Sequence, residues 1–145
     1  LVIAGRPLHE DEELNNALKN GSKRILLPGF IPRDQLNDFF GGATAFVFPS
    51  YFEGFGIPII EAMASNCLVL SSNSSCMPEI ANDAAHYSRP GNIEDWMSAL
   101  NFAIQNEEDV ELLKKKGLER AKYFKWEHSA DQVWKSFQEI LPNGK

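Results

Sequence analysis

The stretch from Glu53 to Glu61 reads EGFGIPIIE, and it places two glutamates around two glycines and a proline. It directly follows an apolar run, AFVFPSYF, which is typical of a buried strand that ends in a loop. Glycine allows the backbone to approach a ligand closely, and proline is favoured in the first turn of a helix. The sequence therefore predicts a strand, a glycine-containing loop and a helix that begins near Ile57 or Pro58.

Short β-branched runs alternate with helical spacing along the chain, which is typical of βαβ units and a parallel sheet. The expected strands are residues 1–5, 24–29, 44–50, 67–72 and 84–88. The expected helices are residues 10–19, 34–40, 58–64 and 78–81, followed by helices at 94–105, 110–124 and 127–140. The predicted fold class is α/β, a Rossmann-like parallel sheet flanked by helices, with a helical C-terminal tail that packs through its tryptophans.

Composition indicates one globular domain over residues 1–145. The hydrophobic share of 43% argues against a disordered chain, and no apolar run is long enough to span a bilayer. A net charge of −6 argues against nucleic-acid binding. Cys67 and Cys76 form no CxxC pair and the three histidines lie far apart, so we expect a reducing cytoplasm and no metal site. Because the chain opens inside an apolar strand, LVIAG, we expect a domain truncated at its N-terminal side.

The two glutamates are candidates for ligand binding, because ligands of a parallel α/β sheet collect beyond the carboxyl ends of the strands. A structural explanation stays open for each: a helix dipole favours an acid such as Glu61 in a first turn, and Glu53 suits a solvated turn. Carboxylates accept hydrogen bonds from vicinal hydroxyls, and free amides at a helix start favour a phosphate. The pair therefore fits a nucleotide-sugar. A glycosidase also uses two carboxylates, but helix-start amides oppose the raised pKa that its general acid needs.

Several motifs give the chain a resemblance to a known family. EGFGIPIIEAMA, with VFPS before it and CLVLSSNSSCMPEI after it, resembles the signature of the retaining GT-B glycosyltransferases of family 4, the group 1 glycosyltransferases. LPGFIPRDQLNDFF and GLERAKYFKWEHSA resemble further elements of that family, and the resemblance covers essentially the whole chain in order. It implies the C-terminal, donor-binding half of a GT-B fold. It also implies transfer of a sugar from a nucleoside-diphosphate-sugar to a glycan, lipid or polysaccharide precursor, without a metal or cofactor.

The resemblance implies roles for individual residues. Glu53 contacts the transferred sugar and is the catalytic residue, and Glu61 binds the ribose hydroxyls. The other implied donor-binding residues are Gly54, Phe55, Gly56 and Ile57 in the glycine loop and Phe30, Ile31 and Pro32, whose main chain borders the nucleobase. For Arg6 and Glu79, a supporting role near the site and a plain surface position both stay open.

The chain also departs from the family pattern. Family members carry an Arg and a Lys that grip the diphosphate upstream of the first strand, and an N-terminal domain that binds the acceptor; this chain begins after both. The absent domain is also where peripheral contact with the cytoplasmic face of a membrane would lie. Asn66 stands where the family usually has glycine, and both residue types tolerate left-handed geometry at a helix end.

Two other classes of protein are alternatives. A dinucleotide-dependent oxidoreductase would need a GxGxxG turn after its first strand, and GRPLH at residues 5–9 is not one. A non-catalytic nucleotide-sugar-binding or regulatory module of the same fold would keep the site and lose the chemistry. The intact glutamate pair favours the enzyme over this module.

Overall fold

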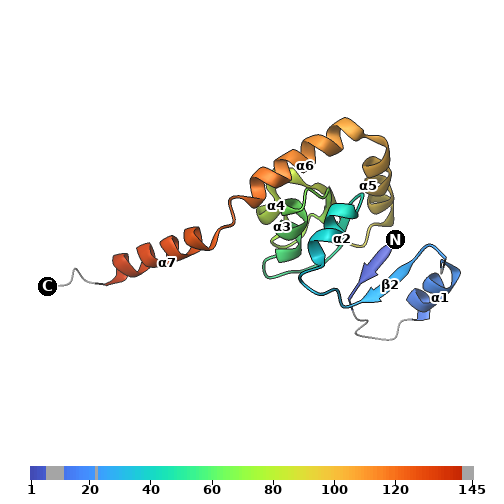
Figure 1. The fold of residues 1–145 in the computed structure, drawn as a ribbon, viewed down its shortest axis with the longest axis horizontal. Helices are drawn as coiled ribbons and strands as arrows, with labels where there is room; N and C mark the ends of the chain where they lie inside the picture. Colours follow the sequence, from blue (N-terminus) through green and yellow to red (C-terminus); the bar gives the residue numbers. More distant parts are fainter. Residues whose placement is uncertain (6–11, 22, 142–145) are drawn as a thin grey trace. The chain divides into compact units, whose positions relative to one another are not determined.

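The computed structural model describes residues 1–5, 12–21 and 23–141. The chain divides into two compact units, Leu1–Asp38 and Phe39–Lys145. Figure 1 shows the helices and strands of both units along the chain. Both units are built from parallel strands and helices, as the alternation of sequence periods predicts.

The first unit is one βαβ element. Strand β1 (Val2–Ala4) pairs in parallel with β2 (Leu26–Gly29), and helix α1 (Glu12–Asn20) lies between them in the sequence. The Gly5 amide donates a hydrogen bond of 2.8 Å to the Gly29 carbonyl, which extends the pairing beyond β1. The residues that follow β2 therefore leave the sheet at its carboxyl edge, where a parallel sheet places its ligand-binding loops.

The second unit contains three parallel strands in the order β3-β4-β5: β3 (Phe46–Phe48), β4 (Val69–Ser72) and β5 (His86–Ser88). The central strand β4 pairs with both neighbours, with Val69 opposite Phe46 and Leu70 opposite His86. All residues of β4 are buried, which is typical of a parallel strand that is covered on both faces.

The helices agree with the sequence prediction to within three residues at each described end. They are α2 (Leu36–Gly42), which contains the unit boundary, α3 (Ile57–Ala64), α4 (Met77–Ala81), α5 (Ile93–Gln105), α6 (Glu107–Ala121) and α7 (Trp126–Ile140). A short 3-10 helix, η1 (Asn82–Ala84), was not predicted. Among the described residues, no helix combines the length and the apolar character that crossing a bilayer requires.

The main core lies between β4 and the helices α5 and α6. Leu68 and Leu70 pack there with Ala99 of α5 and Val110 of α6. Since strand side chains alternate between faces, Val69 points away from this core, toward the side where α3 and α4 contact β4. The α3 helix, which begins at the glycine loop, is therefore packed on a buried strand.

Glycine and asparagine occur where α3 needs special backbone geometry or close packing. At Gly117 of α6 an added Cβ would lie 3.1 Å from Met63 Cγ, so the absence of a side chain lets α6 approach α3 closely. Asn66, just after α3, has a φ of 57°, which confirms the left-handed geometry expected at this helix end.

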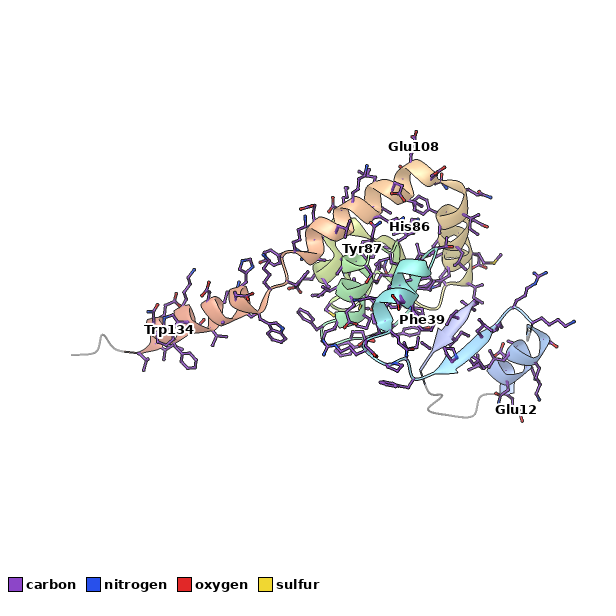
Figure 2. All side chains as sticks on the ribbon, viewed as in Figure 1. Glu12, Phe39, His86, Tyr87, Glu108 and Trp134 are labelled. Carbon is purple, nitrogen blue, oxygen red and sulfur yellow. The ribbon has the colours of Figure 1, made fainter. Side chains whose placement is uncertain are left out.

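The predicted packing of the tail is wrong for part of it. None of the described residues of α7 is buried, and the exposed fractions of Trp126 and Trp134 are 89% and 61%. Figure 2 shows Trp134 on α7 with no neighbouring element around it. Only Trp96 of α5 packs partly against the core. An apolar period predicts that a helix has an apolar face, but it does not identify what covers that face.

Asp95 connects the first turn of α5 to the end of β5. Its carboxylate pairs with Arg89, with 2.7 Å between Nε and Oδ2, and its amide donates to the capping side chain of Asn92. Hydrogen bonds from the Arg89 side chain and main chain lower the pKa of Asp95 to about 2. Because the pKa of an unfolded Asp is higher, about 3.9, the pair stabilises the fold above that pH and loses its contribution as the pH falls toward 2.

Asp95→Asn is therefore expected to flatten the dependence of stability on pH. Between pH 4 and pH 2, the free energy of unfolding should fall less steeply in the variant than in the wild type. Urea unfolding followed by circular dichroism at each pH measures this, with Glu94→Gln as the matched control, because Glu94 is a neighbouring exposed acid with no described ion pair. Parallel curves for wild type and Asp95→Asn would show that the pair is not linked to folding.

Candidate functional site

Two loops meet at one edge of the second unit's sheet. The β3–α3 loop (residues 49–56) follows β3, and the β4–α4 loop (residues 73–76) follows β4. Because β3 and β4 are neighbouring parallel strands, both loops leave the sheet at its carboxyl edge. Two serine hydroxyls connect the β3–α3 loop to the end of β4 and to the loop after it: Ser72 Oγ donates to the Ser50 carbonyl at 2.6 Å, and Ser74 Oγ donates to the Tyr51 carbonyl at 2.7 Å.

Glu53 is held in the β3–α3 loop through its side chain and its main chain. It is half-buried, and the hydroxyl of Ser50 donates to its carboxylate oxygen Oε1 at 2.8 Å. Its carbonyl accepts hydrogen bonds from Ser75 Oγ at 2.9 Å and from Cys76 Sγ at 3.3 Å. The other carboxylate oxygen, Oε2, has no partner within the described part of the chain, so it is available to a ligand hydroxyl.

The glycines of the loop set up the start of α3. Gly56 has a φ of 88°, in the left-handed region, and is the N-cap residue of α3. No side chain caps this helix, and Pro58 lies in its first turn. The amides of residues 54–57 donate to no acceptor in the described structure. Helix α3 begins at Ile57, as the sequence predicts, with successive free N–H groups before it.

Glu61 lies one turn into α3 and is half-buried. The first turn of α3 contains no acidic residue, because Glu61 is the fifth residue of the helix. The stabilisation of an acid by a helix dipole falls off within the first turn. The helix dipole therefore contributes little to the stability of an acidic residue at this position. The Glu61 carboxylate has no hydrogen-bond partner among the described residues.

The remaining candidates lie outside this pair of loops. Phe30, Ile31 and Pro32 directly follow β2 in the first unit; the side chain of Phe30 is 71% exposed and Ile31 is buried. Arg6 lies outside the described residues. In the second unit, the two glutamates thus lie on one continuous segment, the β3–α3 loop followed by α3. The residues expected to border the nucleobase, at 30–32, belong to the first unit.

Arg120 and Phe124, which the sequence analysis did not single out, lie next to the glycine loop. The ring of Phe55 meets that of Phe124 edge to face, with 5.9 Å between the centroids, and the Arg120 guanidinium lies 4.8 Å from the Phe124 centroid. Arg120 also donates to the carbonyls of Glu79 and Ile80 at 2.7 and 2.8 Å. Both residues belong to GLERAKYFKWEHSA, so the motif was visible in the sequence, but its contact with the loop was not.

These residues surround a cavity of about 320 Å³ next to the glycine loop. Its lining residues are Phe55, Glu79, Ile80, Arg120, Tyr123, Phe124, Lys125, His128, Ser129 and Gln132. Glu79 is exposed, and its main chain is held by Arg120, which places this weaker candidate beside Phe55. No group of three or more His, Cys, Asp or Glu side chains in the described ranges is placed to hold a metal ion.

A family model described as "Glycosyl transferases group 1" matches residues 1–120. The O-antigen chain mannosyltransferase B of Escherichia coli is 30% identical over 140 residues, which are 95% of this chain and 37% of that protein. The chain therefore spans little more than a third of the length of this relative.

Two solved structures are similar to the chain. Anabaena HepE, solved in complex with UDP, has a TM-score of 0.85 at 17% identity, over 96% of this chain and 40% of that one. The sucrose-phosphate synthase of Thermosynechococcus elongatus has a TM-score of 0.81 at 24% identity, over 96% of this chain and 37% of that one. These likenesses show the α/β fold that the sequence predicts for the C-terminal half of a GT-B enzyme.

Proposed function

Because this chain belongs to the group 1 glycosyl transferases, we propose that it is the donor-binding part of a retaining enzyme that uses a nucleoside-diphosphate-sugar. One observation carries the proposal: along the chain, the free amides of residues 54–57 lie between two residues with half-buried carboxylates, Glu53 and Glu61. A nucleotide-sugar has the matching order of groups, since its diphosphate lies between the ribose and the transferred sugar.

The amides of residues 54–57 hold the diphosphate in this proposal. Successive backbone N–H groups next to a left-handed residue form an anion-binding concavity, and the positive end of the α3 dipole adds to it. Gly56 supplies the left-handed residue, at a φ of 88°. These amides replace a metal ion as the group that neutralises the diphosphate, and the proposal requires no cofactor.

Glu61 binds the ribose in this proposal. Its carboxylate accepts from the two ribose hydroxyls, and hydrogen bonds to a charged acceptor contribute about 1.5–3 kcal/mol. The main chain around Phe30, Ile31 and Pro32 borders the nucleobase, and the exposed ring of Phe30 directly follows β2.

Glu53 orients the transferred sugar. Ser50 fixes its Oε1, and the free Oε2 accepts from a sugar hydroxyl. As the bond between the anomeric carbon and the phosphate oxygen breaks, negative charge develops on the diphosphate. The amides of residues 54–57 then stabilise this charge, and donors aimed at developing charge are usually the largest single contribution to catalysis.

The acceptor site lies in a further domain of the same protein, in this proposal. The chain spans 37% of the Escherichia coli mannosyltransferase, so most of that relative has no counterpart here. The acceptor is a glycan, lipid or polysaccharide precursor, and the further domain makes any peripheral contact with a membrane. We place the reaction in the cytoplasm, where free thiols such as those of Cys67 and Cys76 persist.

A donor screen on the full-length protein tests the proposal. We expect one of a panel of UDP-, GDP- and ADP-sugars to be transferred or slowly hydrolysed, with nucleoside diphosphate released. Mannosyl donors come first in the panel, because the Escherichia coli relative is named a mannosyltransferase. Binding of a nucleotide-sugar without any release of nucleoside diphosphate would instead support the non-catalytic binding module. Turnover in the enzyme should require no added divalent metal and should persist in EDTA.

A further inference from the structure

We propose that Ser75 is a positioning residue that fixes the main chain of Glu53 and thereby aims its carboxylate at the donor sugar. The role of Glu53 in this inference rests on the proposed function. Ser75 lies in the β4–α4 loop, 22 residues from Glu53 along the chain, and it touches no reacting atom in this account.

The hydroxyl of Ser75 contacts both main-chain polar groups of Glu53. Ser75 Oγ donates to the Glu53 carbonyl at 2.9 Å and accepts from the Glu53 amide at 3.4 Å. Cys76 reaches only the carbonyl, and Ser74 reaches only Tyr51. In the described structure Ser75 is thus the side chain that holds Glu53 from both sides of its Cα.

The backbone of Ser75 shows why the hydroxyl matters. Its φ is 53°, in the left-handed region, where glycine is the residue type that fits without strain. Ser75 therefore has an unfavourable backbone conformation, and its hydroxyl makes two hydrogen bonds to the main chain of Glu53. Packing gives no competing reason for the side chain, because Ser75 is exposed.

The hydrogen bonds between Ser75 and the Glu53 main chain should affect the catalytic rate more than the affinity for the nucleotide. Glu53 Oε1 is also held by Ser50, so a shift of the Glu53 main chain moves the whole carboxylate relative to the sugar. A misplacement of about 1 Å can lower a rate by about 100-fold. Glu61 lies in α3 and makes no contact with Ser75, so binding of the free nucleotide should change little.

Ser75→Gly in the full-length protein tests the inference, because glycine removes the hydroxyl and suits the left-handed backbone. The melting temperature should stay equal to that of the wild type or rise. Deuterium exchange of the Glu53 amide, which donates to Ser75 Oγ in the wild type, should become about tenfold faster. With the donor found in the screen, kcat should fall by about 10- to 100-fold, while Kd for the free nucleoside diphosphate should stay within about twofold.

Asn66→Gly is the matched control. Asn66 is also left-handed, at a φ of 57°, and lies after α3, away from both loops. It should change neither the exchange of the Glu53 amide nor kcat. Ser75→Ala is the second variant: it removes the hydroxyl without relieving the backbone, so it should show the same faster exchange and the same loss of kcat.

Unchanged exchange of the Glu53 amide in Ser75→Gly, or a kcat of this variant within about twofold of the wild-type value, would overturn the inference. A parallel loss of melting temperature and kcat in Ser75→Gly would also overturn it, because the residue would then act on folding alone. A wild-type protein that turns over no donor overturns the proposed function instead. The exchange measurement still decides in that case whether Ser75 holds Glu53.

Discussion

The 145-residue chain by itself is expected to transfer no measurable sugar, whereas the full-length protein is expected to be active. Transfer needs an acceptor held near the anomeric carbon, and such positioning is worth about 7–11 kcal/mol of the barrier. In the proposed function the described loops bind the donor, and no motif of the chain resembles the family's acceptor domain. Release of nucleoside diphosphate from the donor, measured for both proteins side by side, checks this. Measurable transfer by the chain alone would contradict the division into two domains.

Donor binding by the isolated chain should also be weak. The resemblance implies an Arg and a Lys before the first strand that pair with the diphosphate, and each such bond contributes about 1.5–3 kcal/mol. Losing two lowers affinity by about two to four orders of magnitude, which leaves binding in the millimolar range. The net charge of −6 works in the same direction. Calorimetric titration of the isolated chain with UDP, GDP and ADP measures this affinity. Micromolar binding would show that the amides of residues 54–57 hold the diphosphate unaided.

Glu53→Gln in the full-length protein is expected to lower kcat by about 100- to 1,000-fold and to leave the affinity for free nucleoside diphosphate unchanged. The loss is that of one oriented electrostatic group in the transition state, about 2.7–4 kcal/mol. Glutamine has the same size and still offers Ser50 Oγ an acceptor, so the loop should keep its structure. Single-turnover transfer kinetics together with nucleotide titration separate the two quantities.

Glu61→Gln should give the opposite pattern. The variant should bind the donor and the free nucleoside diphosphate about 10- to 100-fold more weakly, because both ligands contain the ribose. Glu108→Gln is the matched control, since Glu108 lies exposed in the first turn of α6 (Figure 2) and belongs to neither loop. Equal losses of kcat and of nucleotide affinity in both glutamate variants would show that the assigned division of roles is wrong.

The elements of the fold could be predicted from the sequence because they depend on local patterns. The switch between strand and helix periods located every described α-helix, and the proline after Ile57 marked the start of α3. The left-handed residue after α3 followed from the known tolerance of asparagine for that geometry. The 3-10 helix after α4 has no such local pattern, and the apolar face of α7 did not reveal whether another element covers it.

The candidate site could be predicted only in part. The residues of EGFGIPIIE are contiguous, so one motif shows the loop, the helix start and both glutamates. The groups that hold this loop come from far along the chain: Ser75 lies 22 residues from Glu53, and Phe124 lies in the segment that follows α6. A serine hydroxyl or a phenylalanine ring has no period or spacing that identifies such a partner. These contacts require the folded arrangement of strands β3 and β4 and helix α6.

The most direct test of the donor site is a crystal structure of the full-length protein with its nucleotide-sugar bound. We expect diphosphate oxygens at hydrogen-bond distance, about 2.7–3.2 Å, from amides of residues 54–57. We also expect the ribose hydroxyls to bind Glu61 and the transferred sugar to bind Glu53. A diphosphate bound away from the β3–α3 loop, with neither glutamate in contact with the donor, would contradict the proposed donor site.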